Sequence, residues 1–319
     1  MKIIEPSVEY VNGNVGLFDR PKHVELCGRV CYKSEDKITD GSAEKFIAGI
    51  IKRGHEAVLE HARITLDLYR YPTVWAWINR IRYEMNTCEG TADYLIGTVH
   101  EHARYVSGNI RAWRNLSFFA LRNGHTVPTV INRMWWENSL FFPEFIHPDD
   151  LCVPDPLTDV NPDTIPNKGH RKIHSWYTLR FICDRGVSHE IVRHRPVAYC
   201  QESTRYCNYS KEGFGGEITV IKPPFFAVGS EQYHAWRDAC SNAEVDYFHL
   251  LNLGCSPQEA RDVLPTSLKT ELVMTATAAE WKHFLKLRTA EAAHPQMREV
   301  ATRAKGILIE KDPEVFGID

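Results

Sequence analysis

Residues 193–206 form the most unusual stretch of the chain and read RHRPVAYCQESTRY. Three arginines and one histidine stand here among hydroxyl and amide side chains. A guanidinium group donates hydrogen bonds in a rigid fork that suits phosphate and planar carbonyl groups, and it also stacks on flat rings. Gln201 and Ser203 add short donors and acceptors, so the stretch fits a pocket for a phosphorylated aromatic ligand such as a nucleotide. A solvated basic turn is the simpler alternative for an isolated cluster of this kind.

The residues before this stretch predict two strands. Apolar and polar residues alternate over 63–69 with the period of two that is typical of a half-buried strand. Residues 173–183 are expected to form its partner, followed by a short turn or helix that leads into the basic segment at 193–195. Between the two strands, residues 72–122 have a helical and aromatic pattern. Residues 143–170 contain six prolines, which indicates an irregular surface connection.

Helices are predicted on both sides of these strands. Residues 43–53 carry apolar side chains at helical spacing, with Ser42 as the N-cap and Gly54 as the stop. Further helices are expected over 230–253, after the capping-box sequences at 256–259 and 277–280, and from Pro295 onward. Because the strands and helices do not alternate as βαβ units, we predict an α+β fold. We expect a single catalytic domain over residues 1–319, with residues 72–170 as an insertion within it.

The composition excludes several classes of protein. The chain has 319 residues, with 38 Lys and Arg against 41 Asp and Glu, and its net charge of −3 disfavours a general nucleic-acid binder. No stretch reaches the roughly 18 consecutive apolar residues of a membrane helix, and the first residues are too polar for a signal peptide. Nine cysteines without a Cys-x-x-Cys pair favour reduced thiols in the cytoplasm over a disulfide scaffold or a zinc knuckle.

A second group of candidate site residues lies near the C-terminal end. Arg288 follows Trp281 by seven residues, so both belong to one face of a predicted helix. A guanidinium on the apolar side of a helix must find an acceptor, because its desolvation is otherwise costly. A structural salt bridge and a ligand contact both meet that requirement. Arg261 and His283 leave the same two alternatives open.

Metal and dinucleotide sites are disfavoured. The segment His55–His61 lacks the His-Glu-x-x-His spacing of a zinc protease, and it does not read as a helix. The segment His100–His102 is a similarly weak candidate. Residues 213–216 are rich in glycine but lack the strand-turn-helix context of a Rossmann or P-loop site. We therefore expect no metal site.

The spacing from Arg193-His194-Arg195 to Ser203 resembles the signature of the flavin-dependent thymidylate synthases. Further segments resemble this family in the same chain order, namely residues 55–61, 107–113, 261–265, 284–288 and 294–296. The resemblance extends from about residue 20 to residue 305. Much of 115–170 matches no feature of the family and looks like an insertion. The resemblance implies a core of antiparallel or mixed sheet with helices, and an insertion that is largely helical.

The resemblance also implies a homotetramer in which FAD and dUMP bind at sites shared between chains. By position in the motifs, the residues that would contact FAD are Ala57, Arg193, His194, Arg195, Gln201, Thr277, Ala279 and His283. The residues that would contact dUMP are Glu190, Arg193, Gln201, Glu202, Ser203, Thr204, Arg205, Arg261 and Arg288. The chain departs from common residues of the family at Glu190, where Gln is frequent, and at Thr277, where Asn is frequent.

The reaction implied by the resemblance is the reductive methylation of dUMP to dTMP. Methylenetetrahydrofolate would donate the carbon, FADH2 the hydride, and NADPH would be the reductant. Arg288 is always protonated, so it would stabilise negative charge on the uracil ring, which makes it the predicted catalytic residue. Cys200 and Cys207, which flank the motif, are predicted to be packing residues. Two alternatives are another flavoprotein or nucleotide-modifying enzyme with the same pocket, and a non-catalytic RNA- or nucleotide-binding module.

Overall fold

The computed structural model describes residues 1–88, 95–100, 103–146, 159–211 and 215–317. The chain divides into two compact units. The first unit comprises Met1–Val11, Gly28–Asp36 and Thr178–Asp319, and the second comprises Asn12–Cys27 and Lys37–Tyr177. Helices and strands are both abundant, which confirms an α+β fold. The single catalytic domain over 1–319 stays a prediction.

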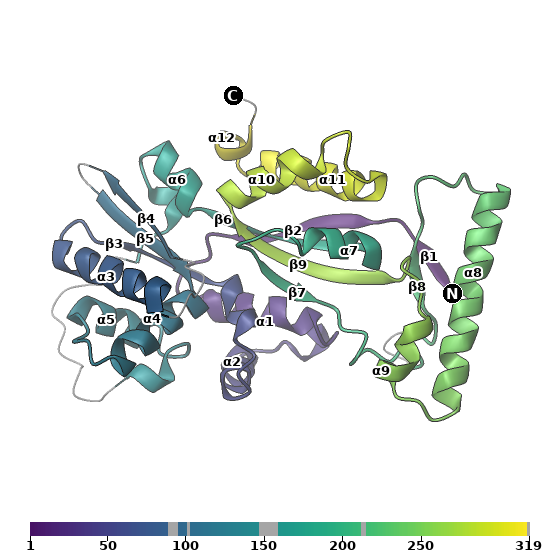
Figure 1. The fold of residues 1–319 in the computed structure, drawn as a ribbon, viewed down its shortest axis with the longest axis horizontal. Coiled ribbons are helices and arrows are strands. Elements are labelled where there is room, and N and C mark those ends of the chain that lie inside the picture. Colours follow the sequence, from purple (N-terminus) through teal and green to yellow (C-terminus); the bar gives the residue numbers. More distant parts are fainter. Residues whose placement is uncertain (89–94, 101–102, 147–158, 212–214, 318–319) are drawn as a thin grey trace. The chain divides into compact units, whose positions relative to one another are not determined.

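The first unit contains a four-stranded sheet with the strand order β2-β6-β9-β7 (Figure 1). Its strands are β2 (Ser7–Gly13), β6 (Trp176–Asp184), β7 (Ala198–Gln201) and β9 (Lys269–Thr277). Strand β7 runs antiparallel to β9, with Ala198 opposite Thr275 and Gln201 opposite Leu272. Every residue of β9 after Lys269 is buried, as expected of an interior strand. Two short parallel strands, β1 (Lys2–Ile4) and β8 (Thr219–Ile221), form a separate sheet.

Most helices of the first unit begin at side-chain caps. The helices are α7 (Arg185–Ile191), α8 (Glu231–Asn252), α9 (Pro257–Ala260), α10 (Ala278–Arg288), α11 (Pro295–Lys311) and α12 (Pro313–Phe316), with 3-10 turns at Glu35–Lys37 and Arg261–Val263. Asp184 caps α7, Ser230 caps α8 and Thr277 caps α10 through side-chain oxygens that accept backbone N–H groups. Figure 1 shows α10 and α11 lying along the sheet, where Trp281 and Phe284 pack against Phe181.

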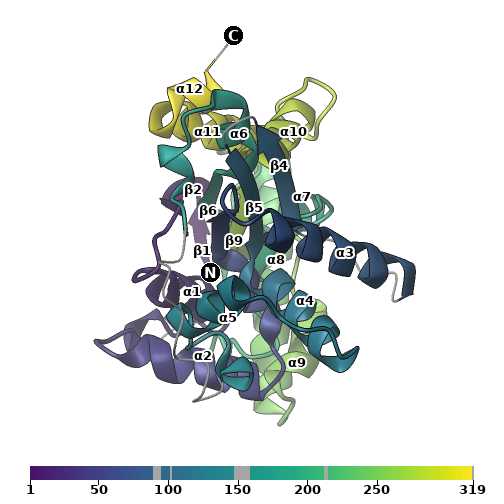
Figure 2. The same cartoon turned by 90° about the vertical axis from the view of Figure 1, so that its left-hand side faces the viewer.

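The second unit contains a three-stranded antiparallel sheet with the order β3-β5-β4, of which β4 and β5 are labelled in Figure 2. Its strands are β3 (Arg63–Asp67), β4 (Leu95–His100) and β5 (Ala103–Asn109). The accompanying helices are α1 (Arg20–Val30), α2 (Ser42–Lys52), α3 (Pro72–Cys88), α4 (Ile110–Arg122), α5 (Thr129–Glu137) and α6 (Lys168–His174), with 3-10 turns at Glu56–His61, Pro143–Phe145 and Pro162–Thr164. Helix α4 packs against α3, and α6 contacts β4.

Most of the predicted helices are confirmed. Helices α8, α10 and α11 begin where their capping residues or Pro295 indicated, and the capping box at Ser256 and Glu259 is formed. Gly54 follows the end of α2 with φ of 69°, a backbone conformation that glycine adopts at low cost. Ser42 is not an N-cap, because α2 begins at this residue and its hydroxyl donates to Glu25 instead.

Two predictions about the middle of the chain are wrong. Residues 72–122 are not helical throughout, because a hairpin of β4 and β5 separates α3 from α4. The partner of β3 is β5, with Ile64 opposite Gly108, whereas β6 belongs to the other sheet. Short apolar runs are compatible with either conformation, and strand preference depends on which neighbour pairs with the strand.

Residues 101–102, 147–158 and 212–214 lie outside the described residues, so parts of the candidate segments at 100–102, 143–170 and 213–216 do as well.

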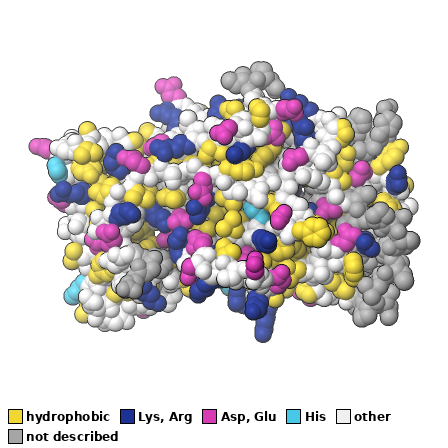
Figure 3. Space-filling view, turned by 180° about the vertical axis from the view of Figure 1, so that it is seen from behind, with side chains coloured by type: hydrophobic (Ala, Val, Ile, Leu, Met, Phe, Trp, Pro, Cys, Tyr) yellow, Lys and Arg dark blue, Asp and Glu magenta, His cyan; other side chains and the backbone are white. Residues whose placement is uncertain are grey.

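None of the helices in the part of the chain that the structure describes has the length and apolar character needed to cross a bilayer. On the face drawn in Figure 3, Lys and Arg side chains are interspersed with Asp and Glu side chains.

Arg114 is a buried cation that joins three segments of the second unit. Its side chain is only 1% exposed, and its Nη2 atom lies 3.0 Å from Glu56 Oε1 and 2.9 Å from Glu144 Oε1. Its Nη1 atom also donates to the carbonyl oxygen of Phe141. Partial burial of Glu144 opposes ionisation, but the hydrogen bonds from Arg114 hold the pKa of this carboxyl below its usual value. Arg114 therefore links α4 to the turns at 56–61 and 143–145.

Glu271 organises a second group of charges, in the first unit. Its Oε1 atom lies 2.8 Å from Lys33 Nζ and 2.7 Å from Lys269 Nζ, and Lys269 Nζ is also 2.8 Å from Glu202 Oε2. Burial by itself would raise the pKa of Glu271, but the two ammonium groups outweigh it and lower the pKa to about 2. These ion pairs link β9 to Glu202, the residue before Ser203.

We predict that Arg114→Met lowers the free energy of unfolding by about 3 kcal/mol, because it leaves two carboxylates and a buried carbonyl without their donor. The matched control is Arg111→Met on the same helix, since Arg111 is 44% exposed and pairs with Glu60. It should cost less than about 1 kcal/mol. Urea unfolding followed by circular dichroism measures both, and equal losses would contradict the role of Arg114.

We also predict that Glu271 makes stability depend on acidic pH. Its native pKa is lowered, so its contribution is present above the unfolded value of about 4.3 and is lost as the pH falls toward 2. Glu271→Gln should therefore lower stability by about 2 kcal/mol at pH 7 and by much less near pH 2.5. Asp238→Asn, in an exposed ion pair of α8, is the control. A loss for Glu271→Gln that does not change with pH would refute this role.

Candidate functional site

Arg288, the last residue of α10, is held by two residues from the segment that precedes β7. Its Nε atom lies 2.9 Å from His194 Nε2, and its Nη1 atom lies 2.8 Å from Glu190 Oε2. Its Nη2 atom donates to the backbone oxygen of Glu190 at 3.1 Å. These contacts use three of the five N–H donors of the guanidinium, and the other two have no partner among the described residues. Glu190 and His194 thus supply the acceptors that we expected Arg288 to need. Two N–H donors of its guanidinium remain available to a ligand.

His194 is a neutral hydrogen-bond acceptor in this arrangement. It is only 7% exposed, and its ring packs against Phe284 and His283 at centroid distances of 5.0 and 5.9 Å. Burial, followed by the charge of Arg288 and the neighbouring His283, lowers the pKa of His194 to about 4. Because Nε2 accepts from Arg288, the proton of the neutral ring is assigned to Nδ1. His194 therefore orients the guanidinium without adding charge.

Tyr199 supports the turn that carries His194. Its hydroxyl lies 2.8 Å from the carbonyl oxygen of Ile191 and 3.2 Å from that of His194. Burial raises the pKa of Tyr199, so the phenol keeps its proton and remains a donor. Tyr199 is not among the site residues predicted from the sequence. The signal was available, because Tyr199 and Gln201 alternate with the buried Ala198 and Cys200 along β7.

Gln201 and Glu202 are held inside the first unit by their side chains. The amide nitrogen of Gln201 donates to Ser188 Oγ at 2.8 Å and to Thr270 Oγ1 at 3.2 Å. Glu202 is only 2% exposed, and its carboxylate binds Lys269 and accepts from the Tyr209 hydroxyl. Both side chains thus position the chain where it enters the turn at 203–206. Their predicted ligand contacts remain predictions.

Arg261 lies close to the turn at residues 203–206. Its Nη1 atom lies 3.5 Å from Thr204 Oγ1, although the two residues are 57 positions apart. The hydroxyl of Ser203 accepts from the backbone N–H of Arg205 at 3.3 Å, and the guanidinium of Arg205 lies over the Tyr206 ring at 5.5 Å. Arg205 and Arg261 are both exposed. Two guanidinium groups and two hydroxyls therefore gather around residues 203–205.

The remaining predicted residues fall into two groups. Arg193, Arg195, Ala279 and His283 are exposed, whereas Thr277 is buried and caps α10 by accepting from the backbone of Glu280. Ala57 is exposed in the 3-10 turn at 56–61, which belongs to the second unit. Cys200 and Cys207 are buried, and burial raises the pKa of Cys207 to about 12, which agrees with a packing role.

The exposed cations suit an anionic, flat cofactor. Arg193 and Arg195 form no ion pair with a carboxylate among the described residues, and both side chains are open to solvent. Guanidinium groups bind phosphates in a bidentate manner and stack on flat rings. A flavin dinucleotide has both phosphates and flat rings. His283 adds a polar ring beside His194. The donor set in and around α10 and residues 193–195 therefore fits FAD.

Comparisons with known proteins match this part of the chain. The model of the Thy1 family, described as thymidylate synthase complementing protein, matches residues 17–83 and 164–314. A flavin-dependent thymidylate synthase of Pyrococcus furiosus is 32% identical over 147 residues, covering 45% of this chain and 59% of the relative. The enzyme of the same name from Pyrococcus horikoshii is 32% identical over 169 residues, covering 52% and 65%.

A third relative, from Geobacter sulfurreducens, carries the same name and is 28% identical over 157 residues, covering 48% of this chain and 66% of the relative. The chain spans about three-fifths of the length of the curated relatives that it matches first. The two regions that match the family model contain most of the residues gathered around Arg288 and Ser203, and together they make up more than half of the chain. The chain therefore belongs to the Thy1 family of thymidylate synthase complementing proteins.

Proposed function

We propose that this protein is a flavin-dependent thymidylate synthase that converts dUMP to dTMP. In this proposal methylenetetrahydrofolate donates the carbon, FAD is the cofactor and NADPH is the reductant. The observation that carries the proposal is a guanidinium, that of Arg288, oriented by Glu190 and His194, in a unit that also gathers cations around Ser203. Membership of the Thy1 family and the names of the relatives support it.

The charges around Ser203 suit a nucleotide monophosphate. Arg205 and Arg261 are exposed, and each can donate to phosphate oxygens in a bidentate manner. The hydroxyls of Ser203 and Thr204 add donors of short reach. In the proposed complex these residues hold the phosphate of dUMP, while Arg288 meets the uracil ring.

Arg288 acts on the ring through charge. C5 of uracil becomes a better nucleophile when negative charge at N3 and the adjacent oxygens is stabilised, and a preoriented cation in a site with little water does this efficiently. The guanidinium keeps its proton at all relevant pH values, so it stabilises an anion and does not act as a base. Glu190 and His194 hold its plane in place, which limits the reorganisation needed when the ring binds.

Bound FAD would supply the hydride that completes the methyl group. Arg193, Arg195 and His283 would hold it, with Thr277 and Ala279 at the start of α10 and with Gln201 and Ala57 as further predicted contacts. These residues bind and orient the cofactor, and none of them is required to carry a proton.

The proposal includes the insertion and the assembly that the family resemblance implies. The family model leaves residues 84–163 unmatched, which supports an insertion within the region 72–170. A homotetramer with shared active sites and a cytoplasmic location are part of the same proposal.

The function is tested on the purified full-length protein. We expect an absorption spectrum with flavin bands, bleaching of those bands by NADPH, and formation of dTMP from dUMP and methylenetetrahydrofolate. A colourless protein that binds no added FAD would contradict the proposal and favour a non-catalytic binding module. A yellow protein that forms no dTMP would favour another flavoprotein reaction.

A substitution at Arg288 tests the catalytic assignment. We predict that Arg288→Gln retains FAD but lowers the rate of dTMP formation by about 100-fold or more, because the neutral amide cannot stabilise the ring anion. Arg237→Gln, in an exposed ion pair of α8, is the control and should leave the rate unchanged. Turnover with saturating dUMP and the flavin content are measured together. Turnover of Arg288→Gln close to that of the unaltered protein would rule out the role.

A further inference from the structure

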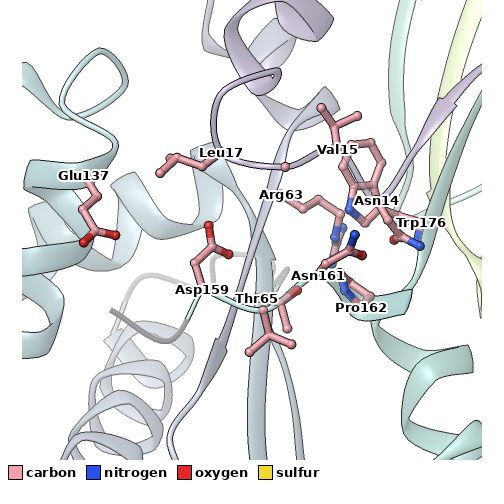
Figure 4. Close-up of a pocket in the computed structure, with 12 residues that line it drawn as sticks. Asn14, Val15, Leu17, Arg63, Thr65, Glu137, Asp159, Asn161, Pro162 and Trp176 are labelled. Carbon is pink, nitrogen blue, oxygen red and sulfur yellow. The ribbon is translucent and has the colours of Figure 1, made fainter. Parts of the chain in front are cut away.

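The second unit contains a cavity of about 300 Å³ that is separate from the residues discussed so far. Five segments contribute to its lining: the residues after β2, strand β3, the last residue of α5, residues 159–162 and the first residue of β6 (Figure 4). The polar side chains among them include Asn14, Arg63, Asp159 and Asn161, and the apolar ones include Leu17 and Trp176. The lining thus combines an apolar wall with a few polar groups, as is typical of sites for small molecules.

Arg63, the first residue of β3, has an unusual environment. Its Nε and Nη2 atoms are buried, and neither has a hydrogen-bond partner among the described residues. In Figure 4 its side chain runs from β3 toward Asn14 and Asn161. Burial lowers the pKa of Arg63 to about 10, so the side chain still carries its charge at neutral pH. Nε and Nη2 form one edge of the guanidinium, and this edge can donate hydrogen bonds to both oxygens of one carboxylate.

The acidic groups of the lining are used by other arginines. Asp159 pairs with Arg20 through contacts of 2.6 and 2.9 Å, and Glu137 pairs with Arg133 at 2.5 Å. Neither carboxylate forms an ion pair with Arg63. A buried charge without a counter-ion is costly. The positive charge of Arg63 therefore needs an anion that these carboxylates do not supply.

His174, which interacts electrostatically with Arg63, does not compensate the charge of Arg63. His174 forms a hydrogen bond with Ser107 at 2.8 Å, and its interaction with Arg63 is repulsive. Burial, together with the charges of Arg63 and His170, lowers the pKa of His174 to about 3, so it is neutral at pH 7. Among the described residues that line the cavity, Arg63 is therefore the cation whose buried Nε and Nη2 edge is unused.

We propose that this cavity binds a small organic monocarboxylate, with its two oxygens on Nε and Nη2 of Arg63 and its apolar body against Leu17 and Trp176. A monoanion matches the charge of Arg63, whereas a phosphate dianion would place excess negative charge beside Asp159 and Glu137. The volume equals that of about ten water molecules in the liquid, which suits a ligand of about ten non-hydrogen atoms. The site lies within the second unit and does not depend on the flavin chemistry proposed above.

Benzoate is a probe of the required size and charge, and inorganic phosphate at equal ionic strength is the comparison. We expect isothermal titration calorimetry of the full-length protein to show one benzoate bound per chain. Phosphate should bind at least about tenfold more weakly. Arg63→Gln should weaken benzoate binding by about tenfold or more, because a charge-assisted pair of hydrogen bonds is lost. Arg70→Gln, at an exposed position shortly after β3, should bind benzoate as the unaltered protein does.

Thermal unfolding shows whether the variant folds. Without ligand, Arg63→Gln should melt at a temperature no lower than the unaltered protein, because the substitution removes an uncompensated buried charge. Benzoate should raise the melting temperature of the unaltered protein and of Arg70→Gln but not that of Arg63→Gln. The proposal is overturned if the unaltered protein does not bind benzoate, if phosphate binds equally well, or if Arg63→Gln binds benzoate normally. A large drop in the melting temperature of ligand-free Arg63→Gln would also overturn it, since Arg63 would then have a partner in the protein.

Discussion

The plane of the Arg288 guanidinium is the constraint on which the candidate active site depends. A guanidinium is rigid and flat, so three hydrogen bonds to Glu190 and His194 determine its orientation completely. Both partners lie more than ninety residues before Arg288 in the sequence. Arg288 and Glu190 each lie on a helix whose first turn is capped by a side chain. Thr277 starts α10 and Asp184 starts α7, while Trp281 and Phe284 fasten α10 to the sheet through Phe181.

Two arginines of the second unit, both with buried guanidinium nitrogens, show how the same residue can serve opposite purposes. Arg114 meets two carboxylates and a carbonyl oxygen, so its charge is compensated and it holds segments together. Arg63 borders a cavity with one edge of its guanidinium unused, so its charge is compensated only when an anion binds. Burial is similar in kind at both positions, and the presence of partners decides between a structural role and a binding role.

The charges of the first unit follow the same principle. Lys33, Lys269, Glu202 and Glu271 compensate one another inside the unit, whereas Arg193, Arg195 and Arg205 keep exposed guanidinium groups that form no ion pair with a described carboxylate. His194 stays neutral because burial and the neighbouring cation oppose its protonation. The proposed ligands, a flavin dinucleotide and a nucleotide monophosphate, would supply the anions that this set of cations requires.

The sequence by itself determined the class of fold, the starts of α8, α10 and α11, and the residues that carry the family signature, because caps and motif spacings are local properties of the chain. It also showed that Arg288 needed an acceptor. Only the tertiary structure decided that Glu190 and His194 are that acceptor, that β3 pairs with β5, and that Nε and Nη2 of Arg63 have no acceptor in the described chain. Strand pairing and the partner of a buried charge depend on residues distant in sequence, so no local pattern can specify them.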